Sequence, residues 1–194
     1  MPAVAIYRYL VPAMWLGWAA YWLASSRNVK QTVLHESLPS RLSYVVPLAL
    51  AGLLLSVPNL PLPVPALQAR FLPVAVRPFV VDAVLTCAGL LFSVWARQYL
   101  GPNWSSVVTI KEGHELVTSG PYAWVRHPIY TGILLALWGS AMAIGEWRAI
   151  GAMALASFSF WRKLQLEERY MLQQFGLAYQ TYRRNVKALI PFIL

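Results

Sequence analysis

Five stretches with few charged residues constrain this chain more than any other feature of its sequence. They cover roughly residues 9–26, 42–57, 79–97, 129–145 and 147–162. A helix needs about 20 apolar residues to cross the hydrocarbon of a bilayer, and it satisfies its own backbone hydrogen bonds while doing so. We therefore predict an all-α membrane protein with about five transmembrane helices.

The composition supports a membrane location. The chain is 58% hydrophobic and 12% charged, whereas a soluble domain is usually about one quarter charged. Its net charge of +9 comes from basic residues that lie between and after the apolar stretches, as in membrane proteins that face anionic lipid. Membrane lipids are therefore expected partners, and nucleic acid is not. No cleavage site follows the first stretch, so we expect it to stay as a span.

Two connections between the stretches have distinctive sequences. The last two stretches are separated only by Gly145 and Glu146, which predicts a tight helical hairpin. Both stretches are short for a crossing, so we expect their helices to extend further or the bilayer to thin around them. Val57–Pro65 is rich in proline, which removes backbone donors and clashes with a helical turn. This segment is predicted to be an extended linker.

The basic residues fall unequally on the two sides of the five predicted spans. One side takes Arg27, Lys30, Arg41, Arg97, Lys111, Arg126, Arg162, Lys163, Arg169, Arg183, Arg184 and Lys187, and the other takes Arg8, Arg70, Arg77 and Arg148. The positive-inside rule places the richer side in the cytoplasm, with the N-terminus outside and the C-terminus in the cytoplasm. The loop 98–128 and the tail 163–194 then share the cytoplasmic side.

Two clusters of polar residues would meet on that side. The loop Gly120–Gly132 carries Arg126 and His127 among tyrosines and prolines, and Glu167-Glu168 follow the last apolar stretch. A carboxylate pair just below the hydrocarbon is costly unless it has a partner. The candidate partners are Arg126, Arg162, Lys163 or a cationic ligand. The plainer interpretation of the loop is a set of turns whose Arg touches lipid headgroups.

The C-terminal tail has the pattern of an amphipathic helix. Its aromatic and aliphatic stripe recurs at three- to four-residue spacing and faces protein or membrane. Gly176 is expected to divide this helix into two pieces. No metal site is expected, because His35, His114 and His127 are scattered and Cys87 is the single cysteine.

At these residues the sequence resembles the isoprenylcysteine carboxyl methyltransferase family and, more loosely, the phospholipid N-methyltransferases. The resemblance covers about residues 97–194, half of the chain. The matching elements are Asn103-Trp104-Ser105, Gly120-Pro-Tyr122, Arg126-His-Pro-x-Tyr130, Gly132, Glu167-Glu168, Phe175-Gly-x-x-Tyr179-x-x-Tyr182 and Ile190-Pro191. Their order and spacing together carry the resemblance, since each motif alone is weak.

The resemblance implies an integral-membrane enzyme that transfers a methyl group from S-adenosylmethionine to a lipophilic acceptor entering from the bilayer. It favours O-methylation of an isoprenylcysteine-like carboxylate. Residues 1–194 would form a single membrane domain, with N-terminal spans and linker in 1–78 and the catalytic core in 79–194.

Roles for individual residues follow from the same resemblance. The cofactor-binding residues would be Tyr122, His127, Pro128, Tyr130 and Glu167. The catalytic residues would be Arg126, Glu167 and Glu168. Rings such as those of Tyr122 and Tyr130 stabilise a sulfonium cation through their faces. A carboxylate acceptor would need only a cation to hold it, whereas an amine, thiol or phenol would also have to lose a proton, which Glu167 or Glu168 could accept.

Two competing functions fit parts of the sequence. Membrane sterol and steroid reductases have a similar C-terminal half but bind NADPH, and a carboxylate pair suits a cationic ligand better than a pyrophosphate. A non-enzymatic scaffold or transport subunit would explain the spans but not the ordered motifs. A transporter usually carries polar groups within its spans. Asp82 lies at the start of one, where an N-terminal helix cap is the plainer interpretation. The sequence leaves the acceptor and the oligomeric state open.

Overall fold

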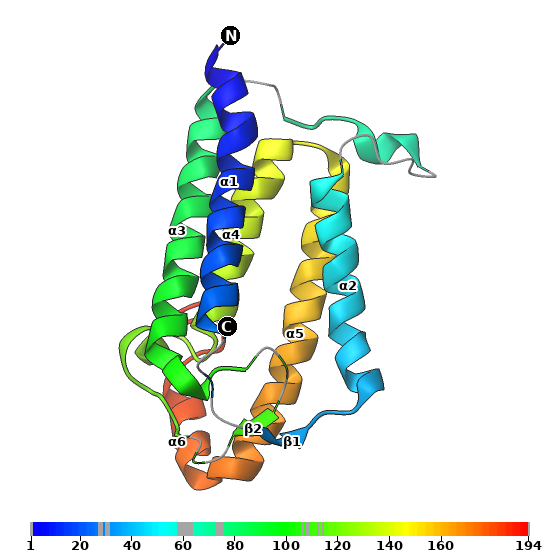
Figure 1. Cartoon of the computed structure of the whole chain (residues 1–194). Coiled ribbons are helices and arrows are strands. Elements are labelled where there is room, and N and C mark those ends of the chain that lie inside the picture. Colours follow the sequence, from blue (N-terminus) through cyan, green and yellow to red (C-terminus); the bar gives the residue numbers. More distant parts are fainter. Residues whose placement is uncertain are drawn as a thin grey trace.

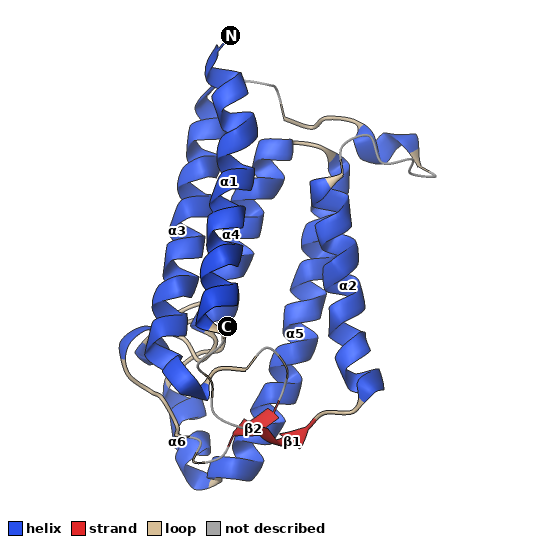
Figure 2. Cartoon of the chain, in the orientation of Figure 1, coloured by secondary structure: helices blue, strands red, loops and turns tan. Residues whose placement is uncertain are grey.

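The computed structural model describes residues 2–26, 29, 32–57, 64–72, 76–105, 107, 109–111, 113 and 115–193. Helices dominate this part of the chain (Figure 2). They are α1 (Pro2–Ser25), α2 (Leu38–Ser56), α3 (Val76–Leu100), α4 (Pro128–Ile144), α5 (Trp147–Phe175) and α6 (Leu177–Asn185). Three short 3-10 turns are η1 (Pro65–Gln68), η2 (Gly101–Asn103) and η3 (Gly120–Ala123). The predicted helical fold is confirmed.

A short pair of strands was not predicted. β1 (Thr32–His35) pairs antiparallel with β2 (Thr109–Lys111), next to the end of α5 (Figure 2). Strands of four and three residues are too short to show an alternating pattern in sequence. Their pairing ties two loops together at the end of the molecule where the polar residues gather.

The five predicted stretches correspond to helices α1 to α5. Among the described residues, Leu38–Ser56 and Phe79–Asn103 are long and apolar enough to cross a membrane, and Pro128–Ile144 is a shorter apolar helix. The last predicted stretch extends beyond residue 162 to Phe175, as a helix too short for a bilayer was expected to do. The number of crossings stays a prediction.

The helices form two groups joined by the predicted hairpin. α1 packs on α3 and α3 on α4, while α2 packs on α5, and α4 and α5 connect the groups (Figure 1). Gly145 closes α4 with a φ of +63°, and Glu146 precedes the first residue of α5. Figure 1 shows that α1, α3 and α5 finish at the same end of the molecule, where β1, β2 and α6 also lie.

Glycines allow α3 and α4 to approach each other closely. A Cβ on Gly89 would lie 2.4 Å from the carbonyl oxygen of Gly132, and one on Gly132 would lie 2.5 Å from the carbonyl oxygen of Gly89. Small residues at such contacts let helix backbones pack tightly in an apolar environment. The position of α4, and with it the loop that precedes it, is therefore fixed by α3.

Tryptophans of α1 attach it to the same pair of helices. The indole N–H of Trp15 donates to the hydroxyl of Ser140 at 2.9 Å, and that of Trp18 donates to Ser93 at 2.8 Å. Buried indoles are usually placed where their N–H finds an acceptor. These bonds hold α1 against α4 and α3, so Trp15 and Trp18 face those two helices.

The proline-rich linker and Asp82 are two further points at which the sequence predictions meet the structure. α2 ends at Ser56, and residues 58–63 of the proline-rich linker lie outside the described residues, as do Arg27 and Lys30 of the basic side. The interpretation of Asp82 as a helix cap is wrong. α3 begins at Val76, so Asp82 lies within the helix, where it is 3% exposed.

Candidate active site

The loop 120–127 is folded into a compact turn before α4 begins. Gly120 has a φ of +59°, and a Cβ at this position would lie 2.3 Å from a tyrosine ring, so only glycine fits. The hydroxyl of Tyr182 donates to the backbone oxygen of Tyr122 at 2.6 Å. Pro128 occupies the first turn of α4, where its missing N–H leaves no helical bond unmade. The prolines and the glycine thus form turns that set the direction of the side chains between them.

The C-terminal tail lies along this loop. The backbone N–H of Arg126 donates to the carbonyl of Lys187 at 2.8 Å, and that of His127 donates to Ala188 at 3.0 Å. The guanidinium of Arg126 donates in addition to the carbonyl of Val186. The loop and the tail therefore meet at one end of the helices, which confirms the prediction that their polar residues come together.

Glu168, near the end of α5, is enclosed by basic groups. Nε of Arg126 donates to its Oε1 at 2.8 Å, and Nε of Arg183 lies 3.2 Å from Oε2. Nε2 of His127 lies 3.4 Å from Oε1, and only 6% of the Glu168 side chain is exposed. We call Arg126, Glu168, Arg183 and the backbone of 186–188 the loop–tail clamp. Its charge-assisted bonds are of the stronger kind found in proteins.

Glu167 has a different set of neighbours. The hydroxyl of Tyr130 donates to its Oε1, and Nδ1 of His127 lies 3.5 Å from Oε2. Nζ of Lys163 is 3.9 Å from Oε1, at the loose end of ion-pair distances. A quarter of the Glu167 side chain, 25%, is exposed. This carboxylate is therefore only partly enclosed by protein.

The two carboxylates and the imidazole between them shift one another's pKa values, and all three lie beyond the ends of the predicted spans. Burial alone would raise the pKa of Glu168, but hydrogen bonds from His127 and Arg126 outweigh it and lower the pKa to about 2. Glu167 is lowered likewise, because the hydrogen bond from His127 outweighs burial. Burial would lower the pKa of His127, but its bonds to both glutamates raise it above the usual value. The site therefore favours an imidazolium held between two carboxylates.

A cavity of about 280 Å³ opens beside Glu167. Of the residues that the sequence predicted for the site, five line this cavity: Tyr122, Arg126, His127, Tyr130 and Glu167. Glu168 and Pro128 are not among the lining residues. Glu168 lies behind the wall in the loop–tail clamp, and Pro128 is buried at the start of α4.

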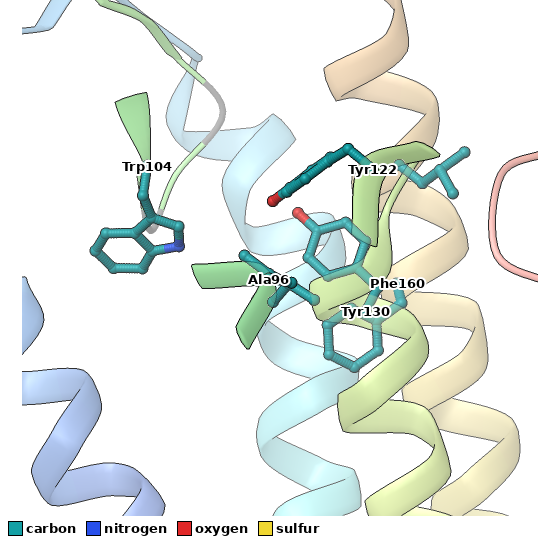
Figure 3. Packing of buried hydrophobic residues seen from close by; sticks show 7 residues of the cluster. Ala96, Trp104, Tyr122, Tyr130 and Phe160 are labelled. Carbon is teal, nitrogen blue, oxygen red and sulfur yellow. The ribbon is translucent and has the colours of Figure 1, made fainter. Parts of the chain in front are cut away.

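The remainder of the cavity is lined mostly by apolar and aromatic side chains. They include Trp18, Trp22, Leu48, Leu100, Trp104, Val107, Val117, Ile129, Ile133 and Phe160. Figure 3 shows the rings of Tyr122, Tyr130 and Phe160 close together, with Ala96 beside them and the indole of Trp104 further away. The cavity therefore combines a few charged groups with a larger apolar lining, which is the usual character of a small-molecule site.

Sequence reasoning missed several lining residues. Trp18 and Trp22 are spaced one helical turn apart on the first apolar stretch, and with Trp15 this spacing marks the inward face of a helix. Lys163, expected only as a partner of the glutamates, also lies 5.4 Å from the centre of the Tyr130 ring and 5.5 Å from that of Tyr44. The approach of α2 that brings Tyr44 to this point leaves no signal in the sequence.

The fold and the site define a class of protein: a helical protein with membrane-length apolar helices and a charged, partly apolar cavity at one end. Residues 82–173 match the model of the isoprenylcysteine carboxyl methyltransferase (ICMT) family. This match includes Glu167, Glu168 and the loop before α4. The resemblance to that family is therefore confirmed for this part of the chain.

Individual relatives agree with the family match. A protein-S-isoprenylcysteine O-methyltransferase of Schizosaccharomyces pombe is 34% identical over 110 residues, which cover 55% of this chain and 47% of the relative. The protein of the same name from Tribolium castaneum is 36% identical over 96 residues, 48% of this chain and 34% of the relative. Protein-S-isoprenylcysteine O-methyltransferase B of Arabidopsis thaliana is 33% identical over 99 residues, 48% of this chain and 49% of the relative. The chain thus aligns with half or less of the length of these relatives.

Proposed function

We propose that this chain is an integral-membrane enzyme that transfers a methyl group from S-adenosylmethionine to a lipophilic acceptor of the isoprenylcysteine carboxylate kind. One observation carries the proposal. Within the segment that matches the family, the partly exposed carboxylate of Glu167 lies on the wall of a cavity that is lined mostly by aromatic and apolar side chains. Such a cavity suits a cationic cofactor beside an apolar acceptor. The three relatives described above carry the name of this activity.

The side chains around the cavity fit the proposed cofactor. S-adenosylmethionine is a sulfonium with an ammonium group, and when bound it would supply an electrophilic methyl group. We propose that Glu167 faces its positive charge and that the rings of Tyr122 and Tyr130 lie against it. His127 would fix the orientation of Glu167, and Pro128 would fix the start of α4 behind it. These assignments rest on the lining of the cavity and on Glu167 being 25% exposed.

The catalytic proposal follows from how the charges are distributed. A carboxylate acceptor would take the methyl group as the sulfur–carbon bond of the cofactor broke, so no residue would have to remove a proton. Holding two reactants in line supplies about 7–11 kcal/mol of such a barrier. Arg126 lines the cavity and would present positive charge to the acceptor or cofactor, while Glu168 holds its guanidinium in place. An amine, thiol or phenol acceptor would instead use Glu167 as the proton acceptor.

The membrane arrangement is part of the proposal. α1 to α5 would each cross the bilayer, with the N-terminus outside and the cavity and C-terminus on the cytoplasmic side, where the basic residues concentrate. The apolar acceptor would enter sideways from the lipid, and the whole of 1–194 would be one membrane domain with its catalytic core in 79–194. The apolar and aromatic lining contributed by α1, α2 and α4 supports this route.

A methyl-transfer assay tests the proposal. The purified protein in lipid would be incubated with methyl-labelled S-adenosylmethionine and an N-acetylated S-prenylcysteine, with the corresponding carboxamide as control. We expect label in the carboxylic acid substrate only, released as methanol by base, because a methyl ester is base-labile. Base-stable label would point to methylation of another group, and no label with either acceptor would contradict the proposed activity.

A further inference from the structure

One polar atom on the cavity wall lacks a partner. Asn103, the last residue of η2, lines the cavity and is 7% exposed. Its Oδ1 is buried and accepts no hydrogen bond from any of the described residues. A buried acceptor without a donor destabilises the folded state, so folded proteins rarely keep one without a reason. A ligand that donates to Oδ1 would supply such a reason.

The turn that carries Asn103 is held in place from several directions. Nη1 of Arg97 donates to the carbonyl of Gly101 at 2.8 Å, and its Nη2 donates to the carbonyl of Ser25 at 2.7 Å. The guanidinium also lies 4.4 Å from the centre of the Trp104 ring. Asn103 therefore sits on a braced turn between the ends of α1 and α3. This brace fixes the position of Asn103 on the cavity wall.

The surroundings of Asn103 narrow the ligand group that it would meet. The other cavity residues of its own segment and of the following loop are Trp104, Ser105, Val107, Glu115, Leu116 and Val117, of which only Glu115 is charged. The other charged groups, Arg126, His127, Lys163 and Glu167, come from the loop before α4 and from α5. A flat, uncharged ring with donors on its edge suits the first group of residues. An ammonium or carboxylate suits the second.

Resting on the proposed function, we infer that Asn103 binds the adenine ring of S-adenosylmethionine, with Oδ1 accepting from the exocyclic amine. Asparagine is well suited to adenine, because its carboxamide matches the donor and acceptor on the edge of that base. The cofactor would then lie with its base towards η2 and its amino-acid end towards α5. Asn103 would select for adenosine, a role separate from that of the charged residues.

Binding measurements with two ligands test this inference without requiring turnover. S-adenosylhomocysteine and S-inosylhomocysteine differ in that the second carries an oxygen in place of the adenine amine. Affinities of both would be measured by calorimetry for the wild type, Asn103→Ala and Asn103→Leu. Gln98→Ala, which removes an exposed amide from α3, is the matched control.

The expected result has three parts. The wild type and Gln98→Ala bind the adenosyl ligand at least about tenfold more tightly than the inosyl ligand, as a buried donor–acceptor pair implies. Both Asn103 variants lose about tenfold or more in affinity for the adenosyl ligand and discriminate between the two ligands by less than about threefold. Their melting temperatures without ligand stay equal to that of the wild type or rise, because the unpaired acceptor has been removed.

Each other outcome overturns the inference and shows whether the role of Asn103 alone or also the proposed function fails. If the variants melt lower but keep the affinity and the discrimination of the wild type, Asn103 is structural. If the wild type binds both ligands equally well, Asn103 does not recognise the exocyclic amine of adenine, while the proposed function stands. If the wild type binds neither ligand, the proposed function fails and the role of Asn103 fails with it.

Discussion

Two neighbouring carboxylates on α5 have opposite surroundings. Glu168 is closed in by Arg126, Arg183 and His127, and 6% of its side chain is exposed. Glu167, one residue earlier, faces the cavity and keeps 25% of its side chain exposed. A carboxylate whose partners are all supplied by the protein stabilises the fold. One that is left partly exposed is available to a ligand, and we propose that this difference separates the structural role of Glu168 from a binding role of Glu167.

The largest expected effect on stability comes from removing the enclosed carboxylate of Glu168. Glu168→Ala leaves Arg126 and its neighbours without their anion in a buried position, which costs about 3–5 kcal/mol. The loop and the tail should separate, and thermal unfolding in detergent should occur at a clearly lower temperature. Glu115→Ala, which removes an exposed carboxylate, is the control. Equal melting temperatures for all three proteins would show that the loop–tail clamp does not hold the fold.

Substitution of Glu167, the partly exposed carboxylate, should affect cofactor affinity more than stability. Glu167→Gln keeps the size of the side chain and its ability to accept from Tyr130 but removes the charge beside His127, so the melting temperature should fall less than in Glu168→Ala. Affinity for S-adenosylmethionine should fall about 10- to 100-fold, since charge-assisted contacts with a cation contribute about 1.5–3 kcal/mol. Calorimetry of the variant beside the wild type measures this. An unchanged affinity would remove Glu167 from the proposed cofactor site.

The pH dependence of the melting temperature tests whether His127 is held as an imidazolium between Glu167 and Glu168. The pKa of Glu168 lies at about 2, below its usual value, so its contribution is present above about pH 4.5 and is lost as the pH falls towards 2. The pKa of His127 is raised, so its contribution is complete below about pH 6.5 and is lost as the pH rises through the raised value. Melting temperatures of the wild type should therefore fall on both sides of this window. In His127→Asn the alkaline decline should flatten, and an identical profile for the two proteins would contradict the arrangement.

The smallest effect is expected at the edge of the site. Tyr182→Phe removes one hydroxyl, which donates to the backbone of Tyr122 at 2.6 Å. A single hydrogen bond of this kind contributes about 1 kcal/mol, so the melting temperature should fall by a few degrees and cofactor affinity only slightly. Tyr9→Phe, at an exposed tyrosine of α1, is the control. A loss of affinity as large as that of Glu167→Gln would mean that the loop position is more sensitive than the contacts indicate.

The sequence predicted the helices well because their signal is local. A lack of charge over a bilayer's width marks α1 to α5, and Gly145 and Gly176 mark two of their ends. It also predicted that the loop with Arg126 and His127 would meet the segment of the two glutamates, since two predicted spans separate these segments and return the chain to the same side. The strands β1 and β2 could not be predicted, because each is stabilised by a partner far away in the chain.

The sequence did not show which of the two glutamates would be enclosed by protein and which would face the cavity. Glu167 and Glu168 are adjacent and chemically identical, and only the packing of the tail against the loop closes one and leaves the other open. Asn103 was part of a matching motif in the sequence, but its unpaired Oδ1 depends on the brace that Arg97 forms between α1 and α3. Such features arise from tertiary packing, which no local pattern encodes.

We propose above all that Glu167, the partly exposed carboxylate beside the aromatic cavity, binds S-adenosylmethionine. The most direct measurement is calorimetric titration of this cofactor into the detergent-purified wild-type protein, with NADPH titrated in parallel. We predict saturable binding of S-adenosylmethionine and no binding of NADPH. Binding of NADPH alone would contradict the claim and assign the site to a reductase, and binding of neither, with a prenylcysteine acceptor present, would leave the protein without the proposed cofactor site.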